Sequence, residues 1–313
     1  MTRRILISGA SGFVGSALLR RLAPEPLRLR CLMHTAPLED PSSLGNIEVV
    51  QADLTRPESL QGLCSGVDAL VHLASAIEAD EETCRVVNEQ GTRALVQEAE
   101  RAGVSRMLYL STAAVYGDGI HRGIKVDEIA PRPASATSAS RLAAESIVLR
   151  AGGAVLRPMF IYGTGDKWFI PAFARLLLGL PFWINGGHAR LSVIAVDELA
   201  RLIAAWCRSS GAARVGVYHA NFPEPVSVRE IGATLASSLG LPLPSEEVDF
   251  DELMTRLNAP PELRRKLALV SFDRFYASSA VWQHLGLTPD APFQQSFLEY
   301  ASYYRAHLGL QHE

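Results

Sequence analysis

The stretch ILISGASGFVG, residues 5–15, decides how the rest of the chain is organised. A short apolar run is followed by Gly9, Gly12 and Gly15, and then by apolar residues at helical spacing. A strand–turn–helix of this kind brings bare backbone amides close to a pyrophosphate at a helix N-terminus, where the helix dipole favours an anion. The G-x-x-G-x-x-G spacing differs from the more widespread G-x-G-x-x-G, so its prediction depends on the elements that follow.

Short apolar segments alternate with helical patterns along the first half of the chain. The spacing predicts strands at 27–33, 47–51, 69–73 and 107–110, with a helix from about Pro57 and a long amphipathic helix at about 83–102. Apolar residues at helical spacing predict a further helix at 228–239. Strands that alternate with helices indicate the α/β class and a doubly wound parallel sheet covered on both faces. Ligands bind such sheets at the carboxyl ends of the strands, so polar residues that follow the strands are candidate site residues.

Composition and charge narrow the classes of function. The chain has 313 residues, 48% of them hydrophobic, and a net charge of −3, which argues against a protein that neutralises nucleic-acid phosphates. Its four cysteines show no metal-ligand or redox spacing and suit a reducing compartment, so we expect no metal site and a cytoplasmic location. No uncharged apolar run reaches the roughly 18 residues of a membrane helix. Arg3 and Arg4 precede an apolar stretch, but its glycines fit a nucleotide turn better than an export signal.

A series of short motifs runs through nearly the whole chain in one order. They are GASGFVG (9–15), Asp53-Leu54, HLASA (72–76), VNEQGT (87–92), STAAVYG (111–117), LRPMFIYG (156–163), RLSVIAVDELA (190–200) and FDRFYASSAVWQHLGLTP (272–289). As a set they resemble the extended short-chain dehydrogenases/reductases, the group that contains nucleotide-sugar epimerases, dehydratases and 3β-hydroxysteroid dehydrogenases.

The resemblance implies an architecture and an activity. It implies a dinucleotide-binding Rossmann domain over residues 1–165, to which a strand and helix near 190–220 return. Residues 166–313 would form mostly a smaller C-terminal lobe that binds a small-molecule substrate. The implied activity is NAD(P)-linked oxidoreductase or epimerase chemistry on a carbonyl or alcohol. Homodimerisation through a four-helix arrangement is implied by analogy alone.

The same resemblance assigns a cofactor role to residues spread over several strand ends. They are Gly9, Gly12, Phe13, Val14 and Gly15 at the pyrophosphate, Asp53 and Leu54 at the adenine, Leu73, Ala74, Ser75 and Asn88 along the cofactor, and Pro158 and Met159 near the nicotinamide. A carboxylate about 20 residues past the glycines would select NAD through the ribose 2′-hydroxyl. His34 and Thr35 stand there instead, and Glu39 and Asp40 follow too late. We therefore expect NADP or NAD, with NADP slightly preferred, although no arginine replaces the carboxylate.

The catalytic pair that the resemblance implies is missing from this chain. The family carries Tyr-x-x-x-Lys on the helix after the fifth strand, where lysine binds the nicotinamide ribose and lowers the pKa of the tyrosine. Alignment on Glu145 places Thr137 and Arg141 at these two positions. A threonine hydroxyl does not ionise near pH 7, whereas arginine stays charged and can still hold ribose hydroxyls. Thr112 matches the family's Ser/Thr that hydrogen-bonds the reacting oxygen.

Two functions remain open, and a third is disfavoured. The first is an enzyme with a substitute proton donor, for which Tyr116, Tyr162, His188 and Lys167 are candidates. The second is a catalytically silent redox sensor or partner-binding protein that binds NAD(P), which the missing pair favours. Hydrolase chemistry is disfavoured because the sequence has no G-x-S-x-G elbow. Arg190 matches an arginine that grips a substrate phosphate in nucleotide-sugar members, or is a surface residue.

Overall fold

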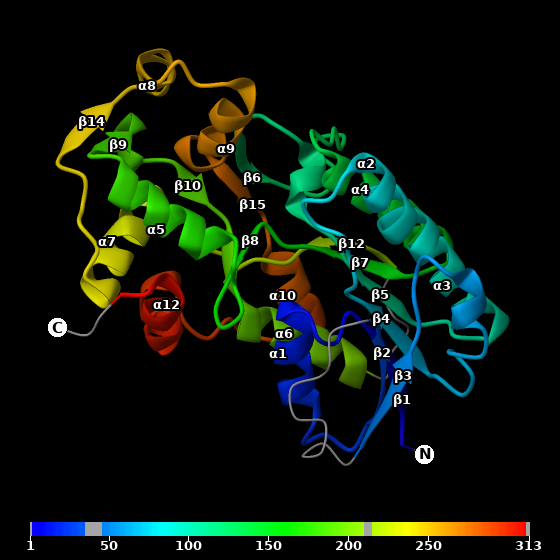
Figure 1. Ribbon diagram of the computed structural model, residues 1–313. Coiled ribbons are helices and arrows are strands. Elements are labelled where there is room, and N and C mark those ends of the chain that lie inside the picture. The colour runs from blue at the N-terminus through cyan, green and yellow to red at the C-terminus, as the bar shows by residue number, and fades with distance from the viewer. Residues whose placement is uncertain (1, 35–45, 210–214, 311–313) are drawn as a thin grey trace.

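The centre of the molecule is a seven-stranded sheet whose strands all run parallel. Its strands are β1 (Arg4–Ser8), β2 (Arg28–Met33), β3 (Ile47–Gln51), β4 (Ala69–His72), β5 (Met107–Leu110), β7 (Ala154–Arg157) and β12 (Gly216–His219). The computed structural model describes residues 2–34, 46–209 and 215–310. The strand order is β12-β7-β5-β4-β1-β2-β3, the two-way winding from β1 that a Rossmann fold requires (Figure 1). The predicted α/β class and doubly wound sheet are confirmed.

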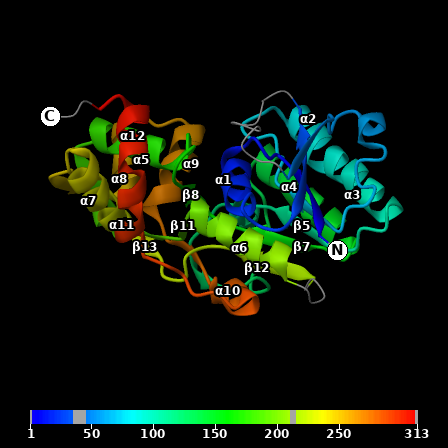
Figure 2. The same cartoon turned by 90° about the horizontal axis from the view of Figure 1, so that it is seen from below.

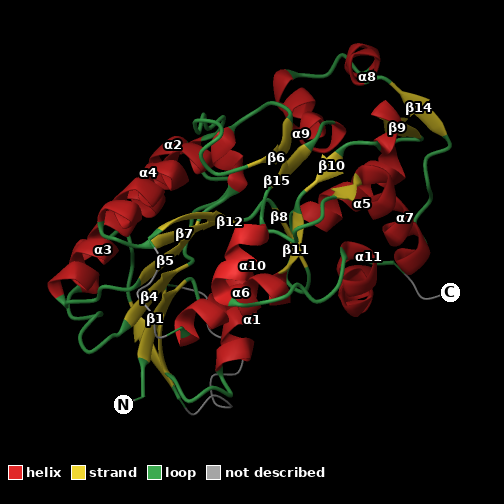
Figure 3. Cartoon of the chain, turned by 180° about the vertical axis from the view of Figure 1, so that it is seen from behind, coloured by secondary structure: helices red, strands yellow, loops and turns green. Residues whose placement is uncertain are grey.

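Helices cover both faces of this sheet, as Figure 3 shows from behind. On one face lie α1 (Phe13–Leu22), α6 (Val196–Arg208) and α10 (Ser279–Leu285), and on the other α3 (Gly91–Arg101) and α4 (Ala136–Arg150). Along β1 the side chains alternate, so that Ile5 and Ile7 pack under α1 and α6 while Leu6 packs under α3 and α4. Burial on both faces explains why the strand reads as a continuous apolar run.

Most of the remaining elements form a smaller lobe beside the sheet, on the left of Figure 2. Its helices are α5 (Phe169–Gly179), α7 (Val228–Leu239), α8 (Phe250–Arg256), α9 (Pro261–Ser271), α11 (Phe293–Ser296) and α12 (Ala301–Leu308). The four-stranded sheet contains β13 (Val226–Ser227), β10 (Arg190–Leu191), β15 (Arg274–Tyr276) and β6 (His121–Ile124). Two further pairs join β8 (Phe160–Tyr162) to β11 (Val193–Ala195), and β9 (Phe182–Ile184) to β14 (Glu246–Val248). Short 3₁₀ turns are η2 (Pro57–Leu60), η4 (Ala113–Tyr116), η5 (Asn185–Gly187) and η6 (Phe297–Tyr300).

The helix expected near residues 83–102 is divided into three segments. It begins with α2 (Glu81–Cys84), continues as the π-helical segment η3 (Arg85–Gln90) and ends as α3. Segments with π-helical bonding recur at functional sites because they redirect a side chain within an otherwise regular helix. Here the redirected segment carries Asn88, one of the expected cofactor residues.

One other expectation needs correction. The helix expected from about Pro57 is only the 3₁₀ turn η2, which ends at Leu60. Between α8 and α9 the chain turns at Asn258, which has a left-handed φ of 44° and is followed by two prolines. Proline lacks the amide that a continuing helix needs, so the chain ends one helix and starts another.

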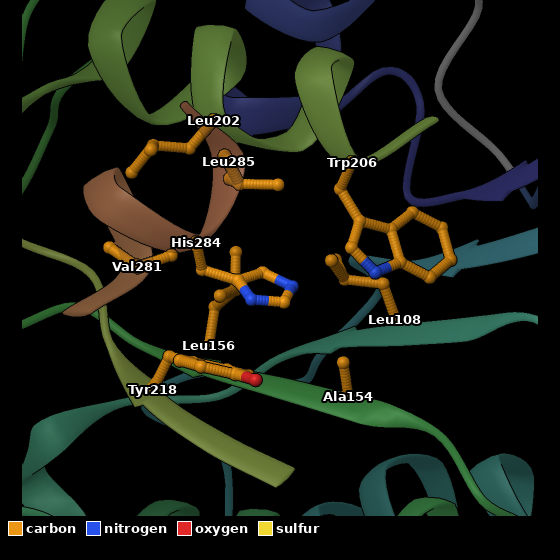
Figure 4. Close-up of a pocket in the computed structure, with 9 residues that line it drawn as sticks. All are labelled: Leu108, Ala154, Leu156, Leu202, Trp206, Tyr218, Val281, His284 and Leu285. Carbon is orange, nitrogen blue, oxygen red and sulfur yellow. The ribbon is translucent and has the colours of Figure 1, made fainter. Parts of the chain in front are cut away.

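A small apolar cavity lies between the sheet and the helices α6 and α10 (Figure 4). Its volume is about 10 Å³, room for no more than about one water molecule. Its lining residues are Leu108, Ala154, Leu156, Leu202, Trp206, Tyr218, Val281, His284 and Leu285. The cavity is therefore a packing imperfection too small for a ligand. Within the described ranges, no helix is both long and apolar enough to cross a membrane.

Candidate functional site

The glycine turn between β1 and α1 forms a close-packed cradle. Gly9 has a φ of 71°, and a Cβ on it would lie 2.6 Å from the backbone nitrogen of Ala74. A Cβ on Gly15 would lie 2.1 Å from the carbonyl oxygen of Gly9. Gly12 differs, because it is exposed, has a φ of −77°, and its Cβ would meet only the Gly9 oxygen at 3.2 Å. Gly9 and Gly15 are thus required by the fold, whereas Gly12 leaves the outer face of the turn open.

The amino end of α1 provides unsatisfied hydrogen-bond donors at this turn. Gly12 is the N-cap, no side chain caps the helix, and no acidic residue lies in the first turn. The first amides of a helix and its dipole favour an anion, and they have no competing carboxylate here. Phe13 and Val14, at the first two helical positions, contribute such amides. The cradle therefore fits a dinucleotide pyrophosphate.

The segment after β4 is fixed beside the glycine turn by Asn88. The Asn88 Oδ1 accepts hydrogen bonds from the Ala76 amide (2.7 Å) and the Ser75 hydroxyl (3.1 Å). Its Nδ2 donates to the Ala76 carbonyl (3.0 Å) and to the Ser140 hydroxyl of α4 (3.0 Å). Leu73, the first residue after β4, is half-buried, as are the residues up to position 76. Asn88 thus ties this segment to the helix that carries the expected catalytic positions.

Asp53 and Leu54 follow β3 at the same edge of the sheet. Asp53 Oδ1 accepts from the amide and hydroxyl of Thr55, both at 2.8 Å, and Oδ2 lies 3.3 Å from His34 Nε2. The Thr55 amide, assisted by the Thr55 hydroxyl and by His34 and other charges, lowers the pKa of Asp53. Leu54 is buried. The NADP expectation also involved Thr35, Glu39 and Asp40, which lie outside the described residues.

Thr112 and Thr137 differ in what their hydroxyl groups can do. Thr112 follows Ser111 at the end of β5, and its Oγ1 accepts a hydrogen bond from the Ala114 amide (3.1 Å). Its own O–H therefore remains available to a substrate oxygen. Thr137 lies in the first turn of α4, with its Oγ1 3.6 Å from the Sγ of buried Cys84.

Arg141 lies one helical turn after Thr137 and reaches the carboxyl end of β5. One terminal nitrogen donates to the carbonyl oxygens of Leu110 (2.6 Å) and Ser111 (3.0 Å). Its Nε is buried and has no hydrogen-bond partner among the residues that the structure describes. A guanidinium has only donors, so the terminal nitrogens of Arg141 can hold a ligand hydroxyl, but the group cannot act as a general base.

Pro158 and Met159 follow β7 and are held by contacts that the sequence did not reveal. The Pro158 carbonyl accepts from the Ala113 amide at 2.7 Å. The Met159 amide donates to the Oδ1 of Asn221 at 2.8 Å, and Asn221 is fully buried. Asn221 lies 62 residues away in the sequence, so no local pattern connects it with this loop.

A buried chain of polar groups supports the carboxyl ends of β5, β7 and β12. Arg157 Nε and a terminal nitrogen donate to Glu145 at 2.9 and 2.5 Å, and both side chains are at most 5% exposed. Another Arg157 nitrogen donates to the Tyr116 hydroxyl at 2.8 Å. His219 Nδ1 lies 3.2 Å from the carbonyl of Ala277 and donates to it, so Nε2 accepts from Tyr116 at 2.8 Å. Tyr116 is therefore a structural group, and burial raises its pKa.

The other proposed proton donors are also not placed as free acids in the site. The Tyr162 hydroxyl is buried at 2.5 Å from Ser296 Oγ, and burial raises its pKa. Lys167 and His188 are exposed side chains of the smaller lobe. Arg190 is exposed and stacks over an aromatic ring of β15 at 5.0 Å. In the described part of the chain, no group of three or more His, Cys, Asp or Glu side chains is arranged to hold a metal ion.

Two buried histidines make the protein sensitive to mild acid. Burial is the main cause that lowers the pKa of His72 to about 3 and that of His219 to about 4 from the ordinary 6.5. Below pH 6.5 these two imidazoles are protonated in the unfolded chain but stay neutral in the folded protein. The unfolding free energy therefore falls as pH decreases. We expect a loss of up to about 1.4 kcal/mol per pH unit for each imidazole between pH 6 and 4.5. Urea unfolding at pH 7.0, 6.0 and 5.0 measures this loss, and equal stability at all three values would contradict it.

Comparison with known proteins agrees with this geometry. Residues 5–218 match the model of the NAD dependent epimerase/dehydratase family, so the chain belongs to that family. A farnesyl-dihydroquinoline-oxide ketoreductase of Stigmatella aurantiaca is 28% identical over 277 residues, covering 84% of this chain and 81% of that protein. A 3 beta-hydroxysteroid dehydrogenase/Delta 5→4-isomerase of Mycobacterium tuberculosis is 27% identical, covering 96% and 90%. The crystal structure of the Bordetella bronchiseptica enzyme WbmH with NAD⁺ superimposes with a TM-score of 0.78 at 21% identity, covering 98% of this chain and 100% of that one.

Proposed function

We propose that the protein binds NAD or NADP and catalyses NAD(P)-linked oxidation or reduction of a carbonyl/alcohol pair. The observation that carries this proposal is the cradle at Gly9, Gly12 and Gly15, open at Gly12 and facing the uncapped amino end of α1. When bound, the dinucleotide supplies hydride transfer. The residues proposed to hold it are Gly9, Gly12, Phe13, Val14, Gly15, Asp53, Leu54, Leu73, Ala74, Ser75, Asn88, Arg141, Pro158 and Met159.

The preference between the two dinucleotides follows from the end of β2. No acidic residue occupies position 34, where His34 stands, so we infer a slight preference for NADP. The Asp53 carboxylate nearby is engaged by Thr55 and approaches His34, which reduces its freedom to bind a ribose hydroxyl. Comparison of the dissociation constants of NADPH and NADH measures the preference.

The substrate lies, in this proposal, between the sheet and the smaller lobe of residues 166–313. Trp168 is 48% exposed in this region, next to buried Phe169, whose ring stacks on Phe160 at 4.5 Å within the core of the lobe. Aromatic surface of this kind favours an apolar substrate skeleton. The ketoreductase and hydroxysteroid dehydrogenase named among the relatives support the same class of substrate. A panel of apolar ketones and their alcohols is therefore the first activity screen.

Within the site, Thr112 would orient the reacting oxygen with its free O–H, and Arg141 would hold ligand hydroxyls through its terminal guanidinium nitrogens. Neither residue supplies a proton that titrates near pH 7. Turnover would therefore be slow compared with that of an enzyme that keeps tyrosine and lysine.

Restoring the pair should raise the rate. We expect Thr137→Tyr with Arg141→Lys to increase reduction of a substrate from the panel by about 10²-fold or more, because general acid–base help typically contributes about 10²–10⁴. Cys84, 3.6 Å from the Thr137 hydroxyl, must give way to the larger ring, so Cys84→Ala is combined with the pair. Thr137→Phe with Arg141→Lys and the same Cys84→Ala is the matched control, because it adds the ring without the phenol. Equal rates for the two triple variants would argue against a catalytic position at 137.

A second function is favoured by the same missing pair. In it the protein binds the dinucleotide without turnover and acts as a redox sensor or partner-binding protein. Tight binding with no oxidation or reduction across the panel would support this function. The four cysteines are buried and free, which supports a reducing, cytoplasmic compartment.

The proposed partners are a small-molecule substrate and a second copy of the chain, with no nucleic acid or membrane. By analogy with the family, the homodimer would form through a four-helix arrangement, for which we propose α3 and α4 of each copy. The outward residues of α3 include Arg93 and Arg101, which pair within the helical segment with Glu89 and Glu98. Such an interface would be polar, and sedimentation at low and high salt would reveal it.

A further inference from the structure

A buried chain of hydrogen bonds runs beneath the proposed cofactor cradle. It joins Ser8 at the end of β1, His72 at the end of β4, Thr92 on α3 and Asn88 on the π-helical segment. Ser8 and Thr92 are fully buried, and His72 and Asn88 are 1% exposed. Polar groups buried this deeply cost free energy unless each donor and acceptor is satisfied. Their pairing can therefore be followed atom by atom.

The direction of every hydrogen in the chain is determined by its two ends. The Thr92 hydroxyl lies 2.5 Å from the Asn88 carbonyl oxygen and must donate to it. Its Oγ1 can then only accept from His72 Nε2 at 2.8 Å, so Nε2 carries the imidazole hydrogen. Neutral His72 therefore has an acceptor at Nδ1, which takes the Ser8 hydroxyl hydrogen at 2.5 Å. The Ser8 oxygen in turn accepts from the amides of the two residues after His72, at 3.2 and 3.4 Å.

The two ends of this chain hold opposite sides of the cradle. At one end, Ser8 precedes Gly9 and binds the amide of Ala74, the atom against which Gly9 packs. At the other end, Asn88 holds Ala76 and Ser140 through its side-chain amide. A change in the hydrogen bonding of the His72 imidazole would therefore alter the positions of both the glycine turn and residues 73–76.

We propose that His72 is a positioning residue for dinucleotide binding, which sets the spacing between the glycine turn and residues 73–76 through Ser8 on one side and Thr92–Asn88 on the other. This inference rests on the proposed function. Burial, assisted by the charge of Arg141, lowers the pKa of His72 to about 3, which keeps the imidazole neutral in the form that the chain needs. The plain alternative is that His72 and Thr92 only fill the core between β4 and α3.

Two substitutions of Thr92 separate positioning from packing. Thr92→Val keeps the volume but removes the hydroxyl, so His72 Nε2–H loses its acceptor. Thr92→Ser keeps the hydroxyl but removes a buried methyl group. Positioning predicts that Val weakens the affinity for NADH by about 10-fold or more and that Ser changes it by less than about 3-fold. Packing alone predicts the reverse order, because a cavity is left only by Ser.

Calorimetric titration of NADH into the wild type and both variants measures this order, with urea unfolding of each as the stability reference. Equal affinities in Val and wild type, or a larger loss in Ser than in Val, would overturn the proposal. Wild-type protein that binds no nicotinamide dinucleotide would instead contradict the proposed function.

A spectroscopic measurement on the wild type without cofactor tests the role of His72 independently of whether the protein binds a dinucleotide. The imidazole ¹⁵N resonances of His72 should show a protonated Nε2 and an unprotonated Nδ1 with no titration between pH 5 and 8. The His72→Gln variant assigns the resonance. A His72 ring that gains a proton near pH 6.5, or that carries its hydrogen on Nδ1, would overturn the inference even if the dinucleotide binds.

Discussion

Gly12→Val is expected to lower the affinity for NADH by at least about 100-fold and to leave the fold intact. The side chain would occupy the outer face of the turn, where the pyrophosphate is proposed to meet backbone amides. Loss of two hydrogen bonds to a charged ligand, at about 1.5–3 kcal/mol each, amounts to at least about 3 kcal/mol. The backbone at Gly12 has a negative φ that any residue adopts, and the added Cβ requires only a small shift of the Gly9 oxygen.

The control for this variant is Gly179→Val at the end of α5. A Cβ on Gly179 would meet nothing within 4 Å, and the residue is exposed, so the same substitution is made away from the proposed site. Isothermal titration gives the affinities, and thermal unfolding checks that both variants fold. Gly12→Val that binds NADH as tightly as Gly179→Val would place the dinucleotide elsewhere.

Arg157→Met is expected to destabilise the protein by about 3–5 kcal/mol. The substitution leaves Glu145, which is 1% exposed, without its cation, and an unpaired buried charge is costly. Tyr116 loses a hydrogen-bond donor in the same step, whereas the hydroxyl of Ser111 still donates to Glu145. The free energy of unfolding in urea, compared with that of the wild type, measures this loss.

The matched control is Arg85→Met, which breaks the exposed pair with Glu82 in the same kind of bidentate geometry. Exposed pairs contribute about 0–1 kcal/mol, so this variant should be nearly as stable as the wild type. The double variant Glu145→Leu with Arg157→Met should lose less than Arg157→Met alone, because it removes the orphaned charge. Equal stability losses for Arg157→Met and Arg85→Met would contradict the account of the buried pair.

Local patterns in the sequence were sufficient for the fold and for the glycine turn. The apolar run before Gly9 and the helical spacing after Gly15 are physical requirements of one strand–turn–helix, so they leave a local trace. The strand at 47–51 and the helix at 228–239 are found at the expected residues for the same reason. The break between α8 and α9 also leaves a local trace, in Pro260 and Pro261.

The supporting groups of the site could not be predicted in this way. Asn221 binds the Met159 amide across 62 residues, and His72 binds Ser8 across 64, so only the folded chain brings these partners together. Tyr116 follows a strand end, where a proton donor is expected, yet its hydroxyl is turned into the interior toward Arg157. The position of a residue in the sequence predicts that it lies at the carboxyl edge of the sheet, but it does not predict the direction in which the side chain points.

The central claim is that the cradle at the glycine turn binds a nicotinamide dinucleotide. Isothermal titration of the wild-type protein with NAD⁺, NADH, NADP⁺ and NADPH tests it most directly. The account predicts saturable binding of one dinucleotide per chain, with NADPH at least as tight as NADH. No saturable binding of any of the four at millimolar concentration would contradict it.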